Sequence, residues 1–146
     1  MIDGEEFLKL AELWIQGATE AEWRCAVSRA YYGAFHVARR FMRRLGFVTP
    51  RADQAHAYLW LRLSNCGEIQ VQSAGSELNR LRRERNRADY DLERAFPNTD
   101  GLIAVQTARQ VVQILHTASA GPTLGQLTDA MKAYERDVLK TVTWQP

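Results

Sequence analysis

The segment from Thr19 to Gly46 constrains the fold more than any other part of the chain. Thr19 and Glu22 have the spacing of a capping box, and Gly46 is a residue type that ends helices. Between these signals the apolar residues form two overlapping stripes with helical spacing, namely Trp23, Ala26, Ala30, Ala34, Val37 and Phe41, and Tyr31, Phe35, Ala38, Met42 and Leu45. A helix that is apolar over so wide an arc is central in a bundle, or faces both a core and a partner chain.

The rest of the chain repeats helical spacing in shorter segments. The pattern predicts further helices at about 5–16, 53–63, 73–92, 102–118 and 124–141. Thr123 and Gln126 have the spacing of a second capping box, and we expect the last residues, 141–146, to be frayed. There is no strand alternation, repeat or second domain. The sequence therefore predicts a single all-α domain over residues 1–146, an antiparallel bundle of five or six helices.

Composition excludes several classes of protein. No apolar run approaches the roughly 18 residues of a membrane span, and the acidic start of the chain lacks the apolar region of a secretory signal. Cys25 and Cys66 have no metal-type spacing and are too few for a disulfide framework. The three histidines share no ligand spacing either. We expect a cytoplasmic protein with reduced thiols, no membrane association, no metal and no cofactor.

One arginine stands where the helical pattern asks for an apolar residue. In the segment 73–92 the apolar stripe is Leu78, Leu81, Ala88 and Leu92, and Arg85 occupies the missing position. A guanidinium directed at an interior needs a hydrogen-bonding partner or an anion, because an unpaired buried charge is very costly. Two interpretations are open. Arg85 could pair with Asp89, four residues on, and pin the bundle or a dimer interface. It could instead face a cleft and bind a phosphate.

A second polar set lies in the central helix. Arg29, Tyr32 and His36 are three and four residues apart, so they share a helix face. They could form a surface for phosphate or nucleic acid, or the polar edge of a core helix. Sixteen of the 19 basic residues are arginine, which suits phosphate recognition, although a genome rich in G and C would produce the same excess.

The two stretches together resemble the HEPN superfamily, named for prokaryotic and eukaryotic nucleotide-binding proteins. The stretches are SRAYYGAFHVARRF, residues 28–41, and LRRERNRADYDL, residues 81–92. They are similar to the Ser-Arg-x-Tyr-Tyr-Ala-x-Phe-His and Arg-Asn-x-Ala-Asp-Tyr stretches of small stand-alone bacterial and archaeal members. The resemblance covers roughly residues 5–120, and the pair in this order is more specific than either motif alone.

The resemblance implies an up-and-down four-helix core over about residues 5–120 and a homodimer whose motif helices face each other. Many members are metal-independent endoribonucleases, and several are toxins paired with a small nucleotidyltransferase antitoxin of the minimal (MNT) type. Arg85 and Asn86 match the first two positions of the family motif, an arginine, a polar residue and a histidine four to six residues after the arginine. By the same resemblance, Tyr90 and Tyr32 are candidate positions for attachment of AMP by such a partner.

Tyr90 stands where that histidine is expected. A phenol is a poor proton acceptor at neutral pH, since its ordinary pKa is about 10. Asp89 could act instead, although pairing with Arg85 would weaken it as a base. His36 could approach from the other motif helix, whereas His56 and His116 are predicted to be surface or rim residues.

Three hypotheses follow from the residues and the resemblance. The first is an endoribonuclease with Arg85, Asn86, Asp89 and Tyr90 as catalytic candidates and with Arg29, Tyr32, His36 and Arg82 binding RNA. The second is a degenerate module that binds RNA, a nucleotide or a partner nucleotidyltransferase without cleavage. The third is a helical oligomerisation domain without a ligand. The surroundings of Arg85 separate them, because an open basic groove favours the first two and sequestration by Asp89 favours the third.

Overall fold

Six α-helices and one short π-helical segment make up the fold. A computed structural model describes all residues, 1–146. The elements are α1 (Glu5–Trp14), α2 (Glu20–Leu45), α3 (Gln54–Ser64), α4 (Ile69–Tyr90), α5 (Asn98–Ala120), α6 (Leu124–Tyr134) and the π-helical η1 (Glu135–Leu139). The predicted all-α class is therefore confirmed. None of the helices combines the length and the apolar character that crossing a bilayer requires.

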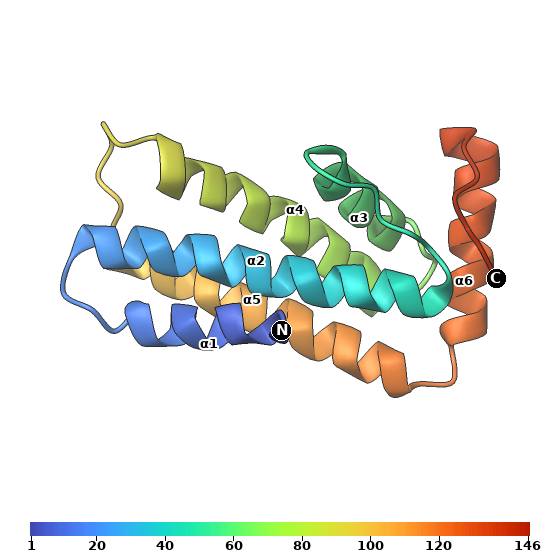
Figure 1. Ribbon diagram of the computed structural model, residues 1–146, viewed down its shortest axis with the longest axis horizontal. Helices are drawn as coiled ribbons and strands as arrows, with labels where there is room; N and C mark the ends of the chain where they lie inside the picture. The colour runs from blue at the N-terminus through green and yellow to red at the C-terminus, as the bar shows by residue number, and fades with distance from the viewer.

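Helices α1, α2, α4 and α5 form an up-and-down bundle in which successive members run in opposite directions (Figure 1). The long α2 packs against α1, α4 and α5, as its wide apolar arc predicts. Helix α3 lies against α4 on the far side from α1, and α6 stands across the end of the bundle where α2 stops (Figure 1). The site motifs on α2 and α4 thus lie on two neighbouring helices.

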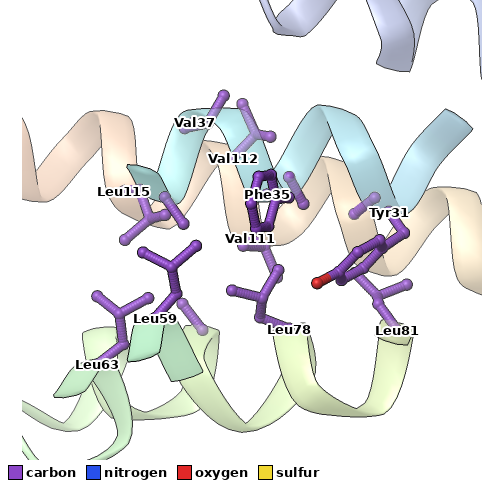
Figure 2. Packing of buried hydrophobic residues seen from close by; sticks show 14 of the residues in the cluster. Tyr31, Phe35, Val37, Leu59, Leu63, Leu78, Leu81, Val111, Val112 and Leu115 are labelled. Carbon is purple, nitrogen blue, oxygen red and sulfur yellow. The ribbon is translucent and has the colours of Figure 1, made fainter. Parts of the chain in front are cut away.

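The core lies between α2, α4 and α5 and continues under α3. Figure 2 shows Tyr31 and Phe35 of α2 directed at Leu78 and Leu81 of α4, with Leu59 of α3 farther along. Tyr31 is 1 % exposed although it carries a hydroxyl. A buried phenol needs a hydrogen-bonding partner, and the partner that it finds is central to the site described below.

Both ends of α2 fall where the sequence places them. The Thr19 hydroxyl accepts a hydrogen bond from the Glu22 amide at 3.3 Å, and Gly46 adopts a left-handed conformation with φ of 101°. The Glu22 carboxylate accepts from the Thr19 hydroxyl at 2.8 Å, not from the backbone amide that a full capping box uses. A close approach of α1 also requires Gly33, because a Cβ there would lie 3.0 Å from the Leu8 Cβ.

Three local predictions are wrong. Thr123 makes no capping hydrogen bond, so the second capping box does not form. Helix α4 begins four residues earlier than expected, at Ile69, because the Glu68 carboxylate accepts from the amides of Gln70 and Val71. It also ends at Tyr90, which leaves Leu92 outside the helix and 70 % exposed. Leu92 is therefore not a member of the apolar stripe.

The C-terminal residues are not frayed but are packed against the bundle. The Trp144 indole donates to the carbonyl of Leu45 at 2.8 Å, and its neighbour Gln145 donates its amide to the carbonyl of Gly46. The Thr143 hydroxyl contacts Tyr58 of α3 and the buried Glu135. These contacts leave no local pattern in the sequence, because Tyr58 and Leu45 lie 85 or more residues before their partners in the tail.

A buried ion pair joins the end of the chain to α3. Arg62 Nη2 lies 2.7 Å from Glu135 Oε2, and the two side chains are 5 % and 1 % exposed. Burial raises the pKa of Glu135, but hydrogen bonds from Thr143 and the Arg62 guanidinium outweigh it and lower this pKa overall. The pair anchors α3, the helix that forms one wall of the candidate site.

Candidate nucleic-acid site

A pocket of about 410 Å³ opens where α2, α3 and α4 meet. Its polar and aromatic lining residues are Tyr32, Asp53, His56, Trp60, Arg82, Arg85, Asn86 and Tyr90. Four of the sequence-predicted site residues on α4, namely Arg82, Arg85, Asn86 and Tyr90, therefore meet Tyr32 of α2 in one place. Helical spacing explains the α4 set, since residues three and four apart share a face.

Arg85 is held by three partners and still lines this pocket. Its Nη2 donates to the Tyr32 hydroxyl, and its Nη1 donates to Asn86 Oδ1 at 2.7 Å. Its Nε lies 3.2 Å from Asp89 Oδ2, an ion pair without the direction of a hydrogen bond. The side chain is 16 % exposed. Arg85 is thus a positioned cation at the pocket wall, and Asp89 does not sequester it.

Asp89 contacts Arg85 and does not line the pocket. Its Oδ2 accepts from the Ser28 hydroxyl of α2 at 3.1 Å and contacts Arg85 Nε as well. A carboxylate that is engaged with a cation and a hydroxyl in this way stabilises the position of the arginine. It is poorly placed to take a proton from a ligand in the pocket.

Arg82 provides a second cation without a carboxylate partner. Its Nη2 donates to Asn79 Oδ1 at 3.2 Å, its Nε is buried without a hydrogen bond, and it makes no ion pair. A guanidinium in this state is available to an anion.

A second hollow, of about 450 Å³, continues the first one and shares Tyr32, Asp53 and His56 with it. The continuation adds Arg39 and Arg51. The combined surface therefore carries four arginines, Arg39, Arg51, Arg82 and Arg85, against one acidic residue, Asp53. Such a balance favours a polyanionic ligand, and the aromatic side chains offer stacking surfaces for bases.

A contrasting hollow of about 200 Å³ lies on the other side of α4, against α5. It also contains arginines, but these are neutralised. Arg80 pairs with Glu77 at 2.5 Å, and Arg87 pairs with Glu84 and Asp100. Arg39, Arg51 and Arg82 therefore differ from Arg80 and Arg87 because they have no acidic partner.

His56 enters the pocket from α3, and the sequence did not assign it to the site. It was predicted to be a surface or rim residue; it is partly buried at the pocket wall, and its Nδ1 lies 2.5 Å from the hydroxyl of the buried Tyr31. Burial lowers its pKa, and the cations of Arg85 and Arg82 lower it further while Asp53 opposes them. His56 is therefore neutral at physiological pH. Its only sequence signal is its place on the α3 face next to Ala55 and Leu59.

Arg29 and His36 lie on the same face of α2 as Tyr32, as their spacing predicts, but neither lines the pocket. The Arg29 guanidinium stacks over the rings of Tyr32 and Phe7 at 5.2 and 5.5 Å. The His36 ring stacks on Phe7 of α1 with ring centres 5.5 Å apart. Burial and the nearby Arg39 lower the pKa of His36. His36 therefore belongs to the contact between α1 and α2.

Arg24 holds the end of α4 and was not singled out by the sequence. This buried guanidinium donates from Nη1 to the carbonyl of Ala88 at 2.9 Å and to the carbonyl of Asp91 at 3.1 Å. Its Nη2 donates to the carbonyl of Arg94 at 2.5 Å. The last carbonyls of a helix have no partners within the helix, so Arg24 supplies them from α2 and places the end of the motif helix.

The two tyrosines that are candidate positions for attachment of AMP differ in their exposure to solvent. Tyr90 is 72 % exposed, whereas the Tyr32 hydroxyl is engaged with Arg85. No three of the histidine, cysteine, aspartate and glutamate side chains come together in an arrangement that could hold a metal ion.

The family model described as HEPN domain matches residues 3–118, which include α1 and α2, α3, α4 and nearly all of α5. No match was found among curated proteins or among solved structures.

Proposed function

Because the chain belongs to the HEPN domain family, we propose that it binds single-stranded RNA in the pocket around Arg85 and cleaves it without a metal ion. The observation that carries this proposal is the charge of the joined pockets, four arginines against Asp53 with aromatic walls. Phosphate contacts and base stacking are the means by which proteins hold single-stranded RNA.

The proposed role of Arg85 is to stabilise the charge that develops on the phosphate during cleavage. Tyr32, Asn86 and Asp89 hold its guanidinium before the ligand arrives. Oriented donors of this kind stabilise a transition state without reorganising during the reaction. In this proposal Tyr32, Arg82 and Tyr90 contact the RNA, and Asn86 positions Arg85.

Cleavage of RNA in EDTA tests the proposal. Purified protein is incubated with mixed single-stranded and transfer RNA, beside an Arg85→Ala variant and an Arg83→Ala variant. Arg83 is exposed on the same helix and lines neither pocket, so it controls for the loss of one positive charge. We expect cleavage by the wild type and by Arg83→Ala and none by Arg85→Ala. Equal activity of all three proteins would point to a contaminating nuclease.

Binding without cleavage is the second candidate function. The observation in its favour is that Tyr90 occupies the place where the family motif has a histidine. In that case RNA, a nucleotide or a partner nucleotidyltransferase would occupy the same pocket. Arg85→Ala would then weaken binding to a labelled oligonucleotide, and no product would appear with any variant.

A homodimer and a toxin–antitoxin role are also part of the proposal. The support is family membership together with two exposed side chains at the end of the motif helix, Tyr90 and Leu92, which are 72 % and 70 % exposed. We expect light scattering to give twice the chain mass for the wild type and a lower mass for Leu92→Glu. The exposed Tyr90 is the proposed site of AMP attachment by a nucleotidyltransferase antitoxin.

A further inference from the structure

We propose that His56 is the general base of this site, supplied by α3 in place of a histidine on the motif helix, and that Tyr31 orients it. The inference rests on the proposed RNA cleavage. Its basis is the position of His56 in both hollows, which are lined by Arg39, Arg51, Arg82 and Arg85, together with its contact to Tyr31.

No other residue in or near the pocket is suited to act as the base. Asp89 contacts Arg85 and is engaged with Ser28, and His36 lies against Phe7 of α1. Tyr90 is a phenol, which is a poor proton acceptor at neutral pH. Asp53 lines the pocket but is exposed at the start of α3. His56 is the only imidazole at the pocket wall.

The contact between His56 and Tyr31 fixes one side of the imidazole ring. The two residues come from α3 and α2, with Nδ1 and the phenol oxygen 2.5 Å apart, and Nε2 makes no hydrogen bond within the chain. When Nδ1–H donates to the Tyr31 oxygen, the Nε2 lone pair is free and the ring can act as a base. If the Tyr31 hydroxyl instead donates to Nδ1, the ring proton is on Nε2, and Nε2 can only donate a hydrogen bond. The proposed role of His56 as a base requires the first arrangement.

The surroundings keep His56 in its neutral form. Arg82 and Arg85 of α4 face it, Asp53 precedes it on the same side, and the Tyr31 phenol is uncharged because burial raises its pKa. Burial and the two cations together lower the pKa of His56. The same cations would bind the phosphate, and the ribose 2′-hydroxyl next to that phosphate would then lie in the same pocket as this neutral base.

The proposed step balances without a further reactant. His56 Nε2 takes the proton of a ribose 2′-hydroxyl while that oxygen forms a bond to phosphorus. The bond from phosphorus to the 5′ oxygen breaks, and this oxygen keeps the electron pair and takes a proton from water. The imidazolium returns its proton to the hydroxide that remains. The products are a 2′,3′-cyclic phosphate and a 5′-hydroxyl, with Arg85 stabilising the charge on the phosphate.

The test compares variants of the full chain on a fluorescent RNA oligonucleotide in EDTA. The variants are His56→Ala, His56→Gln, Tyr31→Phe and, as a matched control, His116→Ala, since His116 is on α5 and lines neither hollow. We expect kcat to fall by about 100-fold or more in both His56 variants, the lower end of the effect of a general base, and to be unchanged in His116→Ala. Added imidazole should partly restore His56→Ala and leave the wild type unchanged.

Measurements on the wild type keep the test independent of variant folding. We expect kcat to rise with pH below about 6.5 and then to stay level, with the rising limb absent in His56→Ala. Nitrogen-15 NMR should show His56 with a protonated Nδ1 and a bare Nε2 at pH 7.5. Tyr31→Phe should lower kcat more than it raises KM and should mix the two tautomers, which a merely structural role would not do.

The outcomes separate the two proposals. If the wild type cleaves RNA and both His56 variants cleave it within a few-fold of the wild type, His56 is not the base and the proposed function stands. A proton found on Nε2 at pH 7.5 would also overturn the base assignment. If the wild type cleaves nothing while Arg85→Ala still weakens RNA binding, the cleavage function fails, and the role of His56 fails with it.

Discussion

Asp89 contacts Arg85 through Nε, at 3.2 Å, while the two terminal nitrogens of the guanidinium donate to Asn86 and Tyr32, which both line the pocket. The two residues lie one helical turn apart, so α4 itself provides the pairing. The sequence left open whether this pair closes the site or supports it. The structure places Arg85 at the pocket wall and Asp89 outside the pocket, so the pair supports the site.

The position of Asp89 leads to a first prediction. Asp89→Asn should weaken RNA binding by about fivefold, equivalent to about 1 kcal/mol, because a partly exposed ion pair that orients Arg85 is lost. The pH dependence of any cleavage should keep its shape, since Asp89 does not take the proton. Fluorescence anisotropy and the pH–rate profile measure the two effects. A profile that loses its rising limb in Asp89→Asn would instead identify Asp89 as the base.

Arg24→Ala should destabilise the fold through the end of α4. Four backbone carbonyls, those of Arg87, Ala88, Asp91 and Arg94, would lose a charged donor, and we expect the free energy of unfolding to fall by about 3 kcal/mol. Arg94→Ala is the matched control, because Arg94 contributes its backbone carbonyl to this contact and its side chain is 81 % exposed. Urea denaturation measures both. Equal stability of the two variants would show that the Arg24 contacts contribute little.

The buried pair between Arg62 and Glu135 should behave as a unit. Arg62→Met alone should lower the free energy of unfolding by about 3–5 kcal/mol, because Glu135 would be left buried and unpaired. Adding Glu135→Leu should recover most of the loss, since a pair of apolar residues avoids the cost of burying charge. A double-mutant cycle in urea gives the coupling energy. Additive losses in the double variant would argue against direct coupling.

Two histidines should make the fold less stable in mild acid. Burial is the main cause that lowers the pKa values of His36 and His56 below the ordinary value of 6.5. Between the lowered pKa and 6.5 the unfolded chain binds more protons than the folded chain, so the free energy of unfolding falls as pH falls through this window. The contribution is fully present above pH 6.5.

Urea titrations between pH 5.5 and 8 measure this dependence in a range above the ordinary carboxyl pKa values. His36→Gln and His56→Gln should each make the dependence on pH shallower. A stability that rises toward pH 5.5 would have the wrong sign and would contradict burial of neutral imidazoles.

Arg82 should contribute a phosphate contact that Arg83 does not. Arg82 lines the pocket without an ion pair, whereas its neighbour Arg83 is exposed and outside it. For single-stranded RNA, loss of one phosphate contact should make the plot of log affinity against log salt shallower by about 0.7. We expect this change in Arg82→Ala and a smaller one in Arg83→Ala. Binding titrations at several salt concentrations measure it, and identical slopes would place the RNA elsewhere.

The helices and the family could be predicted from local patterns in the chain. Periodicity, the Thr19 cap and the stop at Gly46 are local signals, readable because a helix satisfies its backbone within a few residues. The same spacing brought Arg82, Arg85 and Asn86 to one face of α4. The two motif stretches led to the HEPN domain that the family model confirms over residues 3–118.

Which residues from other helices meet Arg85 depends on the packing of the helices and could not be predicted in this way. The side chain of His56 reaches the pocket because α3 packs on α4 and is anchored by Glu135, 73 residues after its partner Arg62. Arg24 reaches the carbonyls of α4 across more than 60 residues of chain. Contacts of this kind depend on how helices pack. Helical periodicity indicates that one face of a helix is buried, but it does not indicate which neighbouring helix covers that face.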